Sequence, residues 1–279
     1  MNEPKSVLIT GCSSGIGLCL AQGLQKQGYR VFATARKPDD VKNLAQLGME
    51  SLLLDVNDSA SIQTAVQEIL QRTGGHLYAL INNAGYGQSG AVEDLRRSVL
   101  REQFETNFFG LVELTNLVLP AMRAQAHGRI VNISSVLGLV VLRYRGAYNA
   151  SKFALEGLTD TLRLELKGSG VFISLVEPGP IISQFRLNAF LAYKKNIDAE
   201  HSVHRAIYLA MEKRLTKQGA TVPFTLGPEA VLNKVSHALK SPRPKIRYYV
   251  TFPTHFLAAM RRVLPHRALD WLSEKLGKA

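Results

Sequence analysis

The chain has 279 residues, of which 46% are hydrophobic and 20% are charged, as in a globular protein with one substantial core. No stretch approaches the roughly 18 uninterrupted apolar residues of a membrane-spanning helix. The polar residues 1–5 lead directly into an apolar run, which is not the pattern of a secretory signal. Cys12 and Cys19 suit neither a disulfide framework nor a four-ligand zinc site, so we expect a cytoplasmic protein without a metal.

The net charge of +12 is concentrated toward the end of the chain, in a basic tail that we define as residues 240–279. Its basic residues, which are opposed by Asp270 and Glu274 alone, are Lys240, Arg243, Lys245, Arg247, Arg261, Arg262, Arg267, Lys275 and Lys278. Aromatic residues are interleaved with them: Tyr248, Tyr249, Phe252, Phe256 and Trp271. We interpret the tail as a solvated basic face, with a peripheral membrane contact or a partner site as alternatives. Without a nucleic-acid-binding motif, we expect no nucleic-acid partner.

Short runs rich in Val, Ile and Leu alternate with longer segments whose apolar residues recur every three or four positions. The runs predict strands buried on both faces at residues 6–10, 29–35, 51–55, 77–82, 129–134 and 171–176. The longer segments predict helices at residues 15–27, 59–72, 100–122 and 147–167. This alternation predicts an α/β fold of the Rossmann type, in which a doubly wound parallel sheet lies between two layers of helices.

The alternation stops at residue 179, and a polar, partly helical stretch continues to residue 228. We expect residues 183–227 to form a substrate lid, because so long an insertion in a compact domain is usually functional. A helix at residues 229–240 and a strand at residues 246–250 are expected to follow. Because no repeat or linker divides the chain, residues 1–279 are expected to form one catalytic domain that includes the lid and the basic tail.

The first predicted strand runs into a glycine-rich turn that opens a helix. Glycines let such a turn tighten and let its backbone approach a pyrophosphate, whose charge is favoured at a helix N-terminus. A turn that serves strand-to-helix packing alone is the alternative, but the strand–turn–helix context favours dinucleotide binding. The candidate cofactor-binding residues here are Gly11, Ser13, Ser14, Gly15, Ile16 and Gly17.

Arg36 and Lys37 follow the second predicted strand, where an NAD-binding domain places a carboxylate for the ribose 2′-hydroxyl. A guanidinium at this position favours a 2′-phosphate, so the sequence indicates NADP(H) as the cofactor; a solvated basic pair is the alternative. Asp55 ends the third strand and is followed by Val56. We expect Asp55 to bond the adenine ring or to cap the next helix.

Ser135, Tyr148 and Lys152 form the most informative group in the sequence, with Asn107 upstream. Tyr148 and Lys152 are four residues apart on a predicted helix, which places both on one face. An ammonium beside a phenol favours the phenolate, so the tyrosine can exchange a proton at neutral pH. Ser135 follows a strand, where its hydroxyl can bond a substrate oxygen and stabilise the charge that develops there.

Through these residues the chain resembles the short-chain dehydrogenase/reductase family over residues 6–183. The resemblance is carried by Thr10-Gly11-x-x-x-Gly15-x-Gly17, Asn82-Asn83-Ala84-Gly85, Asn107, Ser135 with Tyr148-x-x-x-Lys152, and Pro178-Gly179. It implies that Tyr148 transfers the proton, that Lys152 lowers the pKa of Tyr148 and holds the nicotinamide ribose, that Ser135 orients the carbonyl, and that Asn107 anchors a water. It also implies cofactor contacts from Asn83, Ala84, Gly85, Tyr148, Lys152, Pro178, Gly179, Ile181 and Ser183.

A closer resemblance is to the branch that contains retinol and 17β-hydroxysteroid dehydrogenases and bacterial NADP-dependent aldehyde reductases. It rests on residues 148–157, on Glu177-Pro178-Gly179-Pro180 and on residues 247–254. It implies an NADP(H)-dependent oxidoreductase that interconverts an apolar aldehyde or ketone with its alcohol and assembles as a homodimer or homotetramer. The candidate pocket residues, which can equally belong to the core, are Val140, Val141, Leu142, Tyr144, Phe185 and Phe190.

The main alternative is a non-catalytic sensor that binds NADP(H) without turnover. The complete set of Asn107, Ser135, Tyr148 and Lys152 favours the enzyme, because a sensor has no chemical need for all four. Elsewhere, two histidines, His201 and His204, are spaced like metal ligands, but no neighbouring residue completes a ligand set. We expect these histidines on a solvated helix face.

Overall fold

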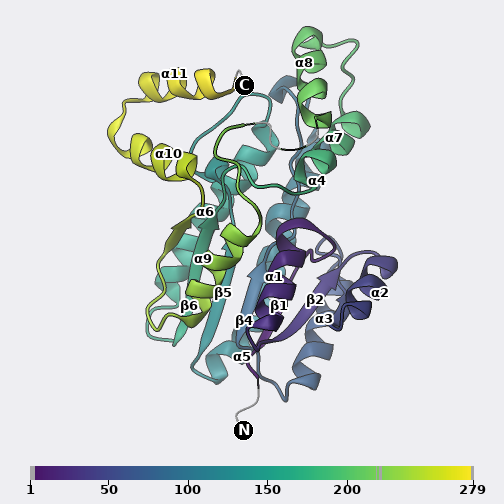
Figure 1. Cartoon of the computed structure of the whole chain (residues 1–279), viewed down its shortest axis with the longest axis vertical. Coiled ribbons are helices and arrows are strands. Elements are labelled where there is room, and N and C mark those ends of the chain that lie inside the picture. The colour runs from purple at the N-terminus through teal and green to yellow at the C-terminus, as the bar shows by residue number, and fades with distance from the viewer. Residues whose placement is uncertain (1–3, 218, 220–221, 278–279) are drawn as a thin grey trace.

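The computed structural model describes residues 4–217, 219 and 222–277. Within these residues, seven strands form one parallel sheet in the order β3-β2-β1-β4-β5-β6-β7 (Figure 1). The strands are β1 (Ser6–Ile9), β2 (Arg30–Ala35), β3 (Glu50–Leu53), β4 (Ala79–Asn82), β5 (Gly128–Ile133), β6 (Val171–Glu177) and β7 (Arg247–Tyr249). Strand order reverses between β1 and β4, which confirms the doubly wound sheet.

Each helix that the sequence predicted is present with bounds that agree to within a few residues. The structure also contains helices that the sequence did not predict. The helices are α1 (Gly15–Lys26), α2 (Pro38–Gln46), α3 (Ser59–Arg72), α4 (Arg97–Phe104), α5 (Gly110–Ala124), α6 (Gly146–Glu165), α7 (Phe185–Asn196), α8 (Arg205–Thr216), α9 (Glu229–Lys240), α10 (Phe252–Val263) and α11 (His266–Gly277). Helix α2 was not expected, although its first turn holds Pro38, Asp39 and Asp40, which are residues that favour a helix N-terminus.

Alternate residues of β1 point to opposite faces of the sheet and separate the two cores. Val7 and Ile9 pack in a cluster with residues of α1 and α9, such as Leu24 and Val235. Leu8 instead packs with residues of α3 and α5. Each fully buried side chain of this size contributes about 1.5–3 kcal/mol of apolar transfer free energy. Figure 1 shows the two helical layers on either side of the sheet, so the three-layer arrangement is confirmed.

The helix expected at residues 100–122 is interrupted by a π-helical turn, Glu105–Phe109, between α4 and α5. The rings of Phe108 and Phe109 pack edge to face at this turn, with centroids 5.4 Å apart. Asn107 is buried in the same turn. An extra residue in a helical turn changes the direction in which the side chains that follow it point, and such turns are frequent at functional sites.

The expected lid and the basic tail both fold as helices above the carboxyl edge of the sheet (Figure 1). Helices α7 and α8 lie within the lid segment, of which residues 218, 220 and 221 fall outside the described part of the chain. Helices α10 and α11 form most of the tail, whose Lys278 also falls outside it. No helix among the described residues is long and apolar enough to cross a membrane.

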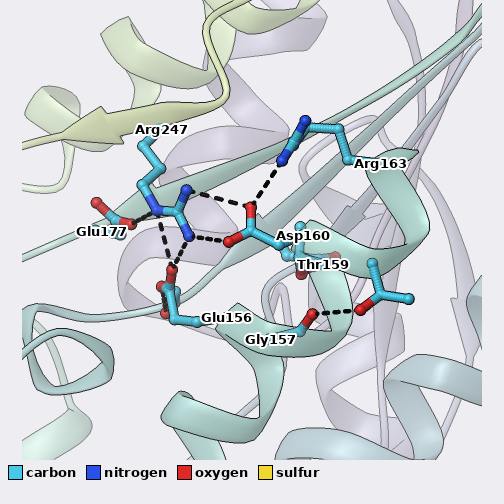
Figure 2. Close-up of polar contacts among 10 residues, drawn as sticks. Glu156, Gly157, Thr159, Asp160, Arg163, Glu177 and Arg247 are labelled. Carbon is cyan, nitrogen blue, oxygen red and sulfur yellow. Dashed lines mark hydrogen bonds and ion pairs between the residues drawn. The ribbon is translucent and has the colours of Figure 1, made fainter. Parts of the chain in front are cut away.

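Arg247 corrects the prediction of a solvated basic tail, because this cation points into the protein. Figure 2 shows its guanidinium among three carboxyl groups that come from α6 and β6. Nη2 lies 2.7 Å from Asp160 Oδ2 and 3.1 Å from Glu156 Oε2, and Nε lies 3.2 Å from Glu177 Oε1. The tail is therefore attached to the sheet through an ion-pair network at its first strand, β7.

Candidate functional site

The carboxyl ends of the strands open on a cavity of about 920 Å³. Ser135, Tyr148 and Lys152 line it, whereas Asn107 does not. The predicted cofactor-binding residues line it without exception: Gly11, Ser13, Ser14, Gly15, Ile16, Gly17, Arg36, Asp55, Val56, Asn83, Ala84, Gly85, Tyr148, Lys152, Pro178, Gly179, Ile181 and Ser183. Residues that are far apart in the sequence thus meet in a single space, while the role of each remains a prediction.

The glycine-rich turn has the shape that a pyrophosphate requires. A Cβ atom at Gly17 would lie 2.1 Å from the Gly11 carbonyl oxygen and 2.6 Å from Asn83 Nδ2, so no other residue fits there. Gly11 itself has a φ of 71°, which favours glycine. The N-cap residue of α1, Ser14, makes no side-chain capping bond. The N–H groups at the start of α1 are therefore available to an anion, and the turn fits a dinucleotide.

Thr10 holds this turn against the end of β4. Its Oγ1 accepts hydrogen bonds from the backbone N–H groups of Asn83 and Ala84, both at 3.0 Å. Asn83 Nδ2 donates in return to the carbonyl oxygens of Thr10 and Gly11, at 2.9 and 3.1 Å. The side chain of Asn83 is thus used to fix the turn.

Some of the residues that the sequence singled out after β2 and β3 reach the cavity, and one does not. Arg36 lines the cavity, while Lys37 is the exposed N-cap residue of α2 and does not. Asp55 lines it too, and its Oδ1 accepts the backbone N–H of Asn57 at 3.0 Å. The alternative of Asp55 as a helix cap is wrong, because Asp58 caps α3 by accepting the N–H of Ala60.

Tyr148 is buried at the start of α6, beneath Ser135 at the end of β5. Burial raises the pKa of Tyr148 to about 12, against the opposing effects of a hydrogen bond from Ser135 and the charge of Arg145. The phenol therefore holds its proton at neutral pH, and the proton transfer predicted for Tyr148 stays a prediction. Ser135 Oγ accepts the N–H of Leu137 at 3.1 Å, which leaves its hydroxyl proton for another acceptor.

Lys152 reaches past Tyr148 to the sheet. Its Nζ donates to the carbonyl oxygen of Ile133 at 2.8 Å and lies 5.8 Å from the centre of the Tyr148 ring. Burial lowers the pKa of Lys152 to about 8, while the charge of Glu156 opposes that shift. The ammonium is thus fixed at the end of β5, where it lines the cavity.

Asn107 lies behind the cavity wall. Its Oδ1 accepts the N–H of Tyr86 at 3.1 Å, and its Nδ2 donates to the Tyr86 carbonyl oxygen at 3.0 Å and to Ser151 Oγ at 3.1 Å. These bonds join the π-helical turn to the loop after β4 and to α6, which carries Tyr148. The side chain of Asn107 therefore positions these elements relative to one another. The water predicted for Asn107 stays a prediction.

Glu156 continues the line of Tyr148 and Lys152, again four residues further along α6. It accepts a hydrogen bond from Ser134 Oγ at 2.5 Å, next to Ser135. Glu177, which precedes Pro178 at the cavity wall, faces Glu156 from β6. Burial, together with the charge of Glu156, raises the pKa of Glu177.

The apolar part of the cavity differs from the expected set. Leu142 and Phe185 line it, and the Phe185 ring meets the Tyr148 ring edge to face at 5.2 Å. Val140 packs beneath Tyr148 in the core, Val141 is about half exposed, and Tyr144 and Phe190 pack in the core beneath the lid. Residues of the cavity wall that sequence reasoning missed include Tyr86, Arg145, Arg186, Arg214, Leu215, Val222 and Leu276.

The tail contributes directly to this wall. Leu276 of α11 lines the cavity, and Leu269 and Leu272 pack against the cluster that contains Tyr148. At the other end of the tail, a Cβ atom at Gly179 would lie 2.1 Å from Thr251 Oγ1. The tail therefore closes on the loop that follows β6, which the charge pattern alone did not indicate.

The two histidines lie before α8 and not on the face of a helix. His201 Nδ1 lies 2.8 Å from Asp198 Oδ2, and His204, the N-cap residue of α8, lies 2.6 Å from Glu93 Oε1. In the part of the chain that the structure describes, no group of three or more potential ligands is arranged to hold a metal ion. The histidines are therefore best described as hydrogen-bond partners of nearby carboxylates.

A profile of the short chain dehydrogenase family matches residues 5–193. The chain is a short-chain dehydrogenase/reductase. An uncharacterized oxidoreductase of Escherichia coli strain K12, YbbO, is 44% identical over 95% of this chain and 93% of its own length. Retinol dehydrogenase 8 of Homo sapiens is 36% identical over 88% of this chain and 80% of its own length. These relatives confirm an oxidoreductase of this family.

Solved structures of short-chain dehydrogenase/reductases have the same fold. One from Burkholderia phymatum in complex with NAD gives a TM-score of 0.78 at 26% identity and covers 98% of this chain and 97% of its own. ElxO with NADP bound gives a TM-score of 0.71 at 25% identity and covers 88% of this chain and 97% of its own. Similar structures thus hold either nicotinamide dinucleotide.

The turn geometry predicts that Gly17→Ala weakens NADPH binding about tenfold or more, or prevents folding, because the methyl group overlaps the Gly11 carbonyl oxygen. Gly157→Ala is the matched control, since Gly157 lies in α6 with open space around its Cβ position. We expect it to bind NADPH normally and to be more stable by about 0.5–1 kcal/mol. Fluorescence titration and urea unfolding measure both effects. A folded Gly17→Ala protein with normal NADPH affinity would contradict the assigned turn.

Proposed function

We propose that this short-chain dehydrogenase/reductase is an NADP(H)-dependent oxidoreductase that interconverts an apolar aldehyde or ketone with its alcohol, acting mainly as a carbonyl reductase. The observation that carries the proposal is the meeting of Ser135, Tyr148 and Lys152 in one cavity with the glycine-rich turn. The residue types match proton transfer to a carbonyl oxygen, and the turn matches a dinucleotide. We further propose that residues 1–279 act as one catalytic domain with the lid and tail as its substrate walls.

The proton on Tyr148 is compatible with the proposed reduction. A phenol whose pKa is raised to about 12 by burial is a proton donor at neutral pH, as reduction of a carbonyl requires. Ser135 has a hydroxyl proton with which to orient the substrate oxygen, and Lys152 adds positive charge where negative charge develops. When bound, the reduced nicotinamide supplies the hydride. Asn107 keeps α6 in register with the loop after β4 and so positions Tyr148.

The substrate class is supported by the wall of the cavity and by relatives. Leu142, Phe185 and Leu276 place apolar surface near Tyr148, which suits the body of a hydrophobic carbonyl compound. Several similar proteins act on apolar alcohols or ketones by name, among them retinol dehydrogenase 8 and 17-beta-hydroxysteroid dehydrogenase type 1 of Homo sapiens.

Tyr148→Phe separates the enzyme from the sensor. This variant is expected to lose about 100-fold or more in kcat/KM for reduction, since the phenolic proton is removed, while its affinity for NADPH remains close to that of the wild type. NADPH oxidation against medium- and long-chain aldehydes, retinal and steroid ketones measures the first, and fluorescence titration the second. Tyr144→Phe is the control, because Tyr144 lies outside the cavity wall. Binding of NADPH by a wild-type protein that turns over no carbonyl would favour the sensor.

Arg36→Asp tests the preference for NADP(H). The guanidinium at the end of β2 is exposed to the cavity without a carboxylate at the corresponding place, as a 2′-phosphate site requires. We expect NADPH affinity to fall about tenfold to 100-fold, in line with the loss of a charge-assisted contact, and NADH affinity to change little. Lys37→Asp, just outside the cavity, is the control and should leave both unchanged. Equal losses for both cofactors in Arg36→Asp would refute the assignment.

The proposed partners are a second copy of the chain and an anionic membrane surface, and a cytoplasmic location stays a prediction. The homodimer or homotetramer rests on the family resemblance. The membrane contact is supported by exposed apolar residues on α10 and α11, namely Phe252, Val263 and Trp271, beside Arg261 and Arg262. Sedimentation of the protein without vesicles gives the mass of the oligomer. With anionic vesicles, the protein should sediment at low salt and stay in the supernatant at high salt. A monomer, or vesicles that leave the protein in the supernatant, would exclude the respective partner.

A further inference from the structure

Arg145 is a cation in the cavity wall for which the proposed reaction has no use. It is the N-cap residue of α6 and precedes Tyr148 by three residues. Its backbone is held on both sides, by a bridge to Gly90 and by the Asn149 N–H, which donates to the Arg145 carbonyl oxygen at 2.8 Å. Its side chain lines the same cavity as Tyr148. The backbone that carries this guanidinium is thus held by the fold three residues before Tyr148.

The charges around Arg145 are of the wrong sign for a structural ion pair. The groups whose charges act on it are Arg214, which opposes its protonated form, and Tyr148. Burial, reinforced by Arg214, lowers the pKa of Arg145 to about 10. Among the described residues, no carboxylate forms an ion pair with it; Glu102, which lines the cavity, is paired with Lys195 at 3.2 Å. A largely buried cation without an anionic partner is unfavourable unless a ligand supplies one.

Two further arginines extend this cationic region from the lid. Arg186 belongs to α7 and Arg214 to α8, and both line the cavity. One nitrogen of Arg186 donates to the Gly219 carbonyl oxygen, while Nη1 is buried without a hydrogen-bond partner among the described residues. Burial and the charge of Arg186 lower the pKa of Arg214. Guanidinium groups from three helices therefore meet at one side of the cavity, although they repel one another.

We propose that the substrate carries an anionic group, a carboxylate or a phosphate, that Arg145 binds with support from Arg186 and Arg214. This inference rests on the proposed function and narrows its substrate to an amphipathic carbonyl compound. Leu142, Phe185 and Leu276 enclose the apolar part, Ser135 and Tyr148 receive the carbonyl oxygen, and the guanidinium groups receive the anion. A guanidinium suits this role because its planar fork binds the oxygens of carboxylates and phosphates in pairs.

The cofactor is the competing anion, and the structure separates the two to a large extent. The phosphate-binding features described above, the turn at Gly17 and Arg36, come from α1 and β2, whereas Arg145 precedes Tyr148 on α6. Arg186 is less distinct, because it follows Ser183, whose Cβ lies 3.1 Å from the Cβ position of Gly15. Arg145 is therefore the residue to change.

The test compares an ω-oxo fatty acid with its methyl ester and with the aldehyde of equal length that bears a phosphate ester. The wild-type protein with NADPH should prefer an anionic substrate to the ester, and the better of the two anions identifies the group. Arg145→Met, which removes charge at similar volume, should lower kcat/KM for the anionic substrate about tenfold or more and leave the ester nearly unchanged. Arg145→Lys should restore part of the loss. Arg143→Met is the control, because Arg143 is exposed and lies outside the cavity wall.

Two outcomes would overturn the proposal. Equal losses for acid and ester in Arg145→Met would assign Arg145 to the structure or to the acidity of Tyr148. A raised KM for NADPH with unchanged selectivity would assign it to the cofactor. If the wild type reduces no carbonyl, the proposed function fails, but the anion site can still be tested. The test is then calorimetry with the corresponding ω-hydroxy fatty acid and its ester in the presence of NADPH. Binding of the acid that Arg145→Met abolishes supports the anion site, and equal binding of acid and ester refutes it.

Discussion

One face of α6 buries a phenol, an ammonium and a carboxylate in succession, and the rest of the site depends on how these groups are satisfied. Tyr148, Lys152 and Glu156 follow one another at the four-residue spacing that aligns side chains along a helix. Burying such groups is unfavourable unless each finds a partner. Lys152 finds the Ile133 carbonyl oxygen, and Glu156 finds Ser134 and Arg247. The carboxyl end of β5 is therefore bound to α6 at the place where the cavity opens.

The same requirement connects the tail to the cavity. Glu156 and Asp160 face the edge of β6, and Arg247 of β7 lies between them (Figure 2). Arg247 lies 2.7 Å from Asp160, 3.1 Å from Glu156 and 3.2 Å from Glu177, so the three carboxyl groups share one cation. With β7 held in this way, the chain turns at Thr251 against Gly179 and continues into α10 and α11. The strand that satisfies the buried carboxylates thus leads into the helices of the tail, whose Leu276 lines the cavity.

Sequence patterns predicted those parts of the molecule that local chemistry determines. The strands follow from apolar runs such as Val7–Ile9, and the turn from glycines that no other residue can replace. Helix α2 was missed because it has nine residues and buries Leu44 alone, so few apolar positions mark it. Arg145 was missed, and Arg247 was assigned to a solvated face. The sequence around a basic residue does not indicate whether its long side chain points to solvent or into the protein. Asn107 matched the family motif but lies behind the cavity wall, because its side-chain amide forms hydrogen bonds with Tyr86 and Ser151.

The protonation states of Tyr148 and Lys152 agree with the proposed reduction of a carbonyl. Burial raises the pKa of Tyr148 to about 12 and lowers that of Lys152 to about 8, so it favours the neutral form of each group. At neutral pH the phenol holds its proton, and the ammonium still holds most of its own. That is the state from which a carbonyl oxygen can receive a proton beside a positive charge. Alcohol oxidation would instead begin from a phenolate, which the burial of Tyr148 disfavours. The protonation states of Tyr148 and Lys152 are therefore those that the proposed reduction uses.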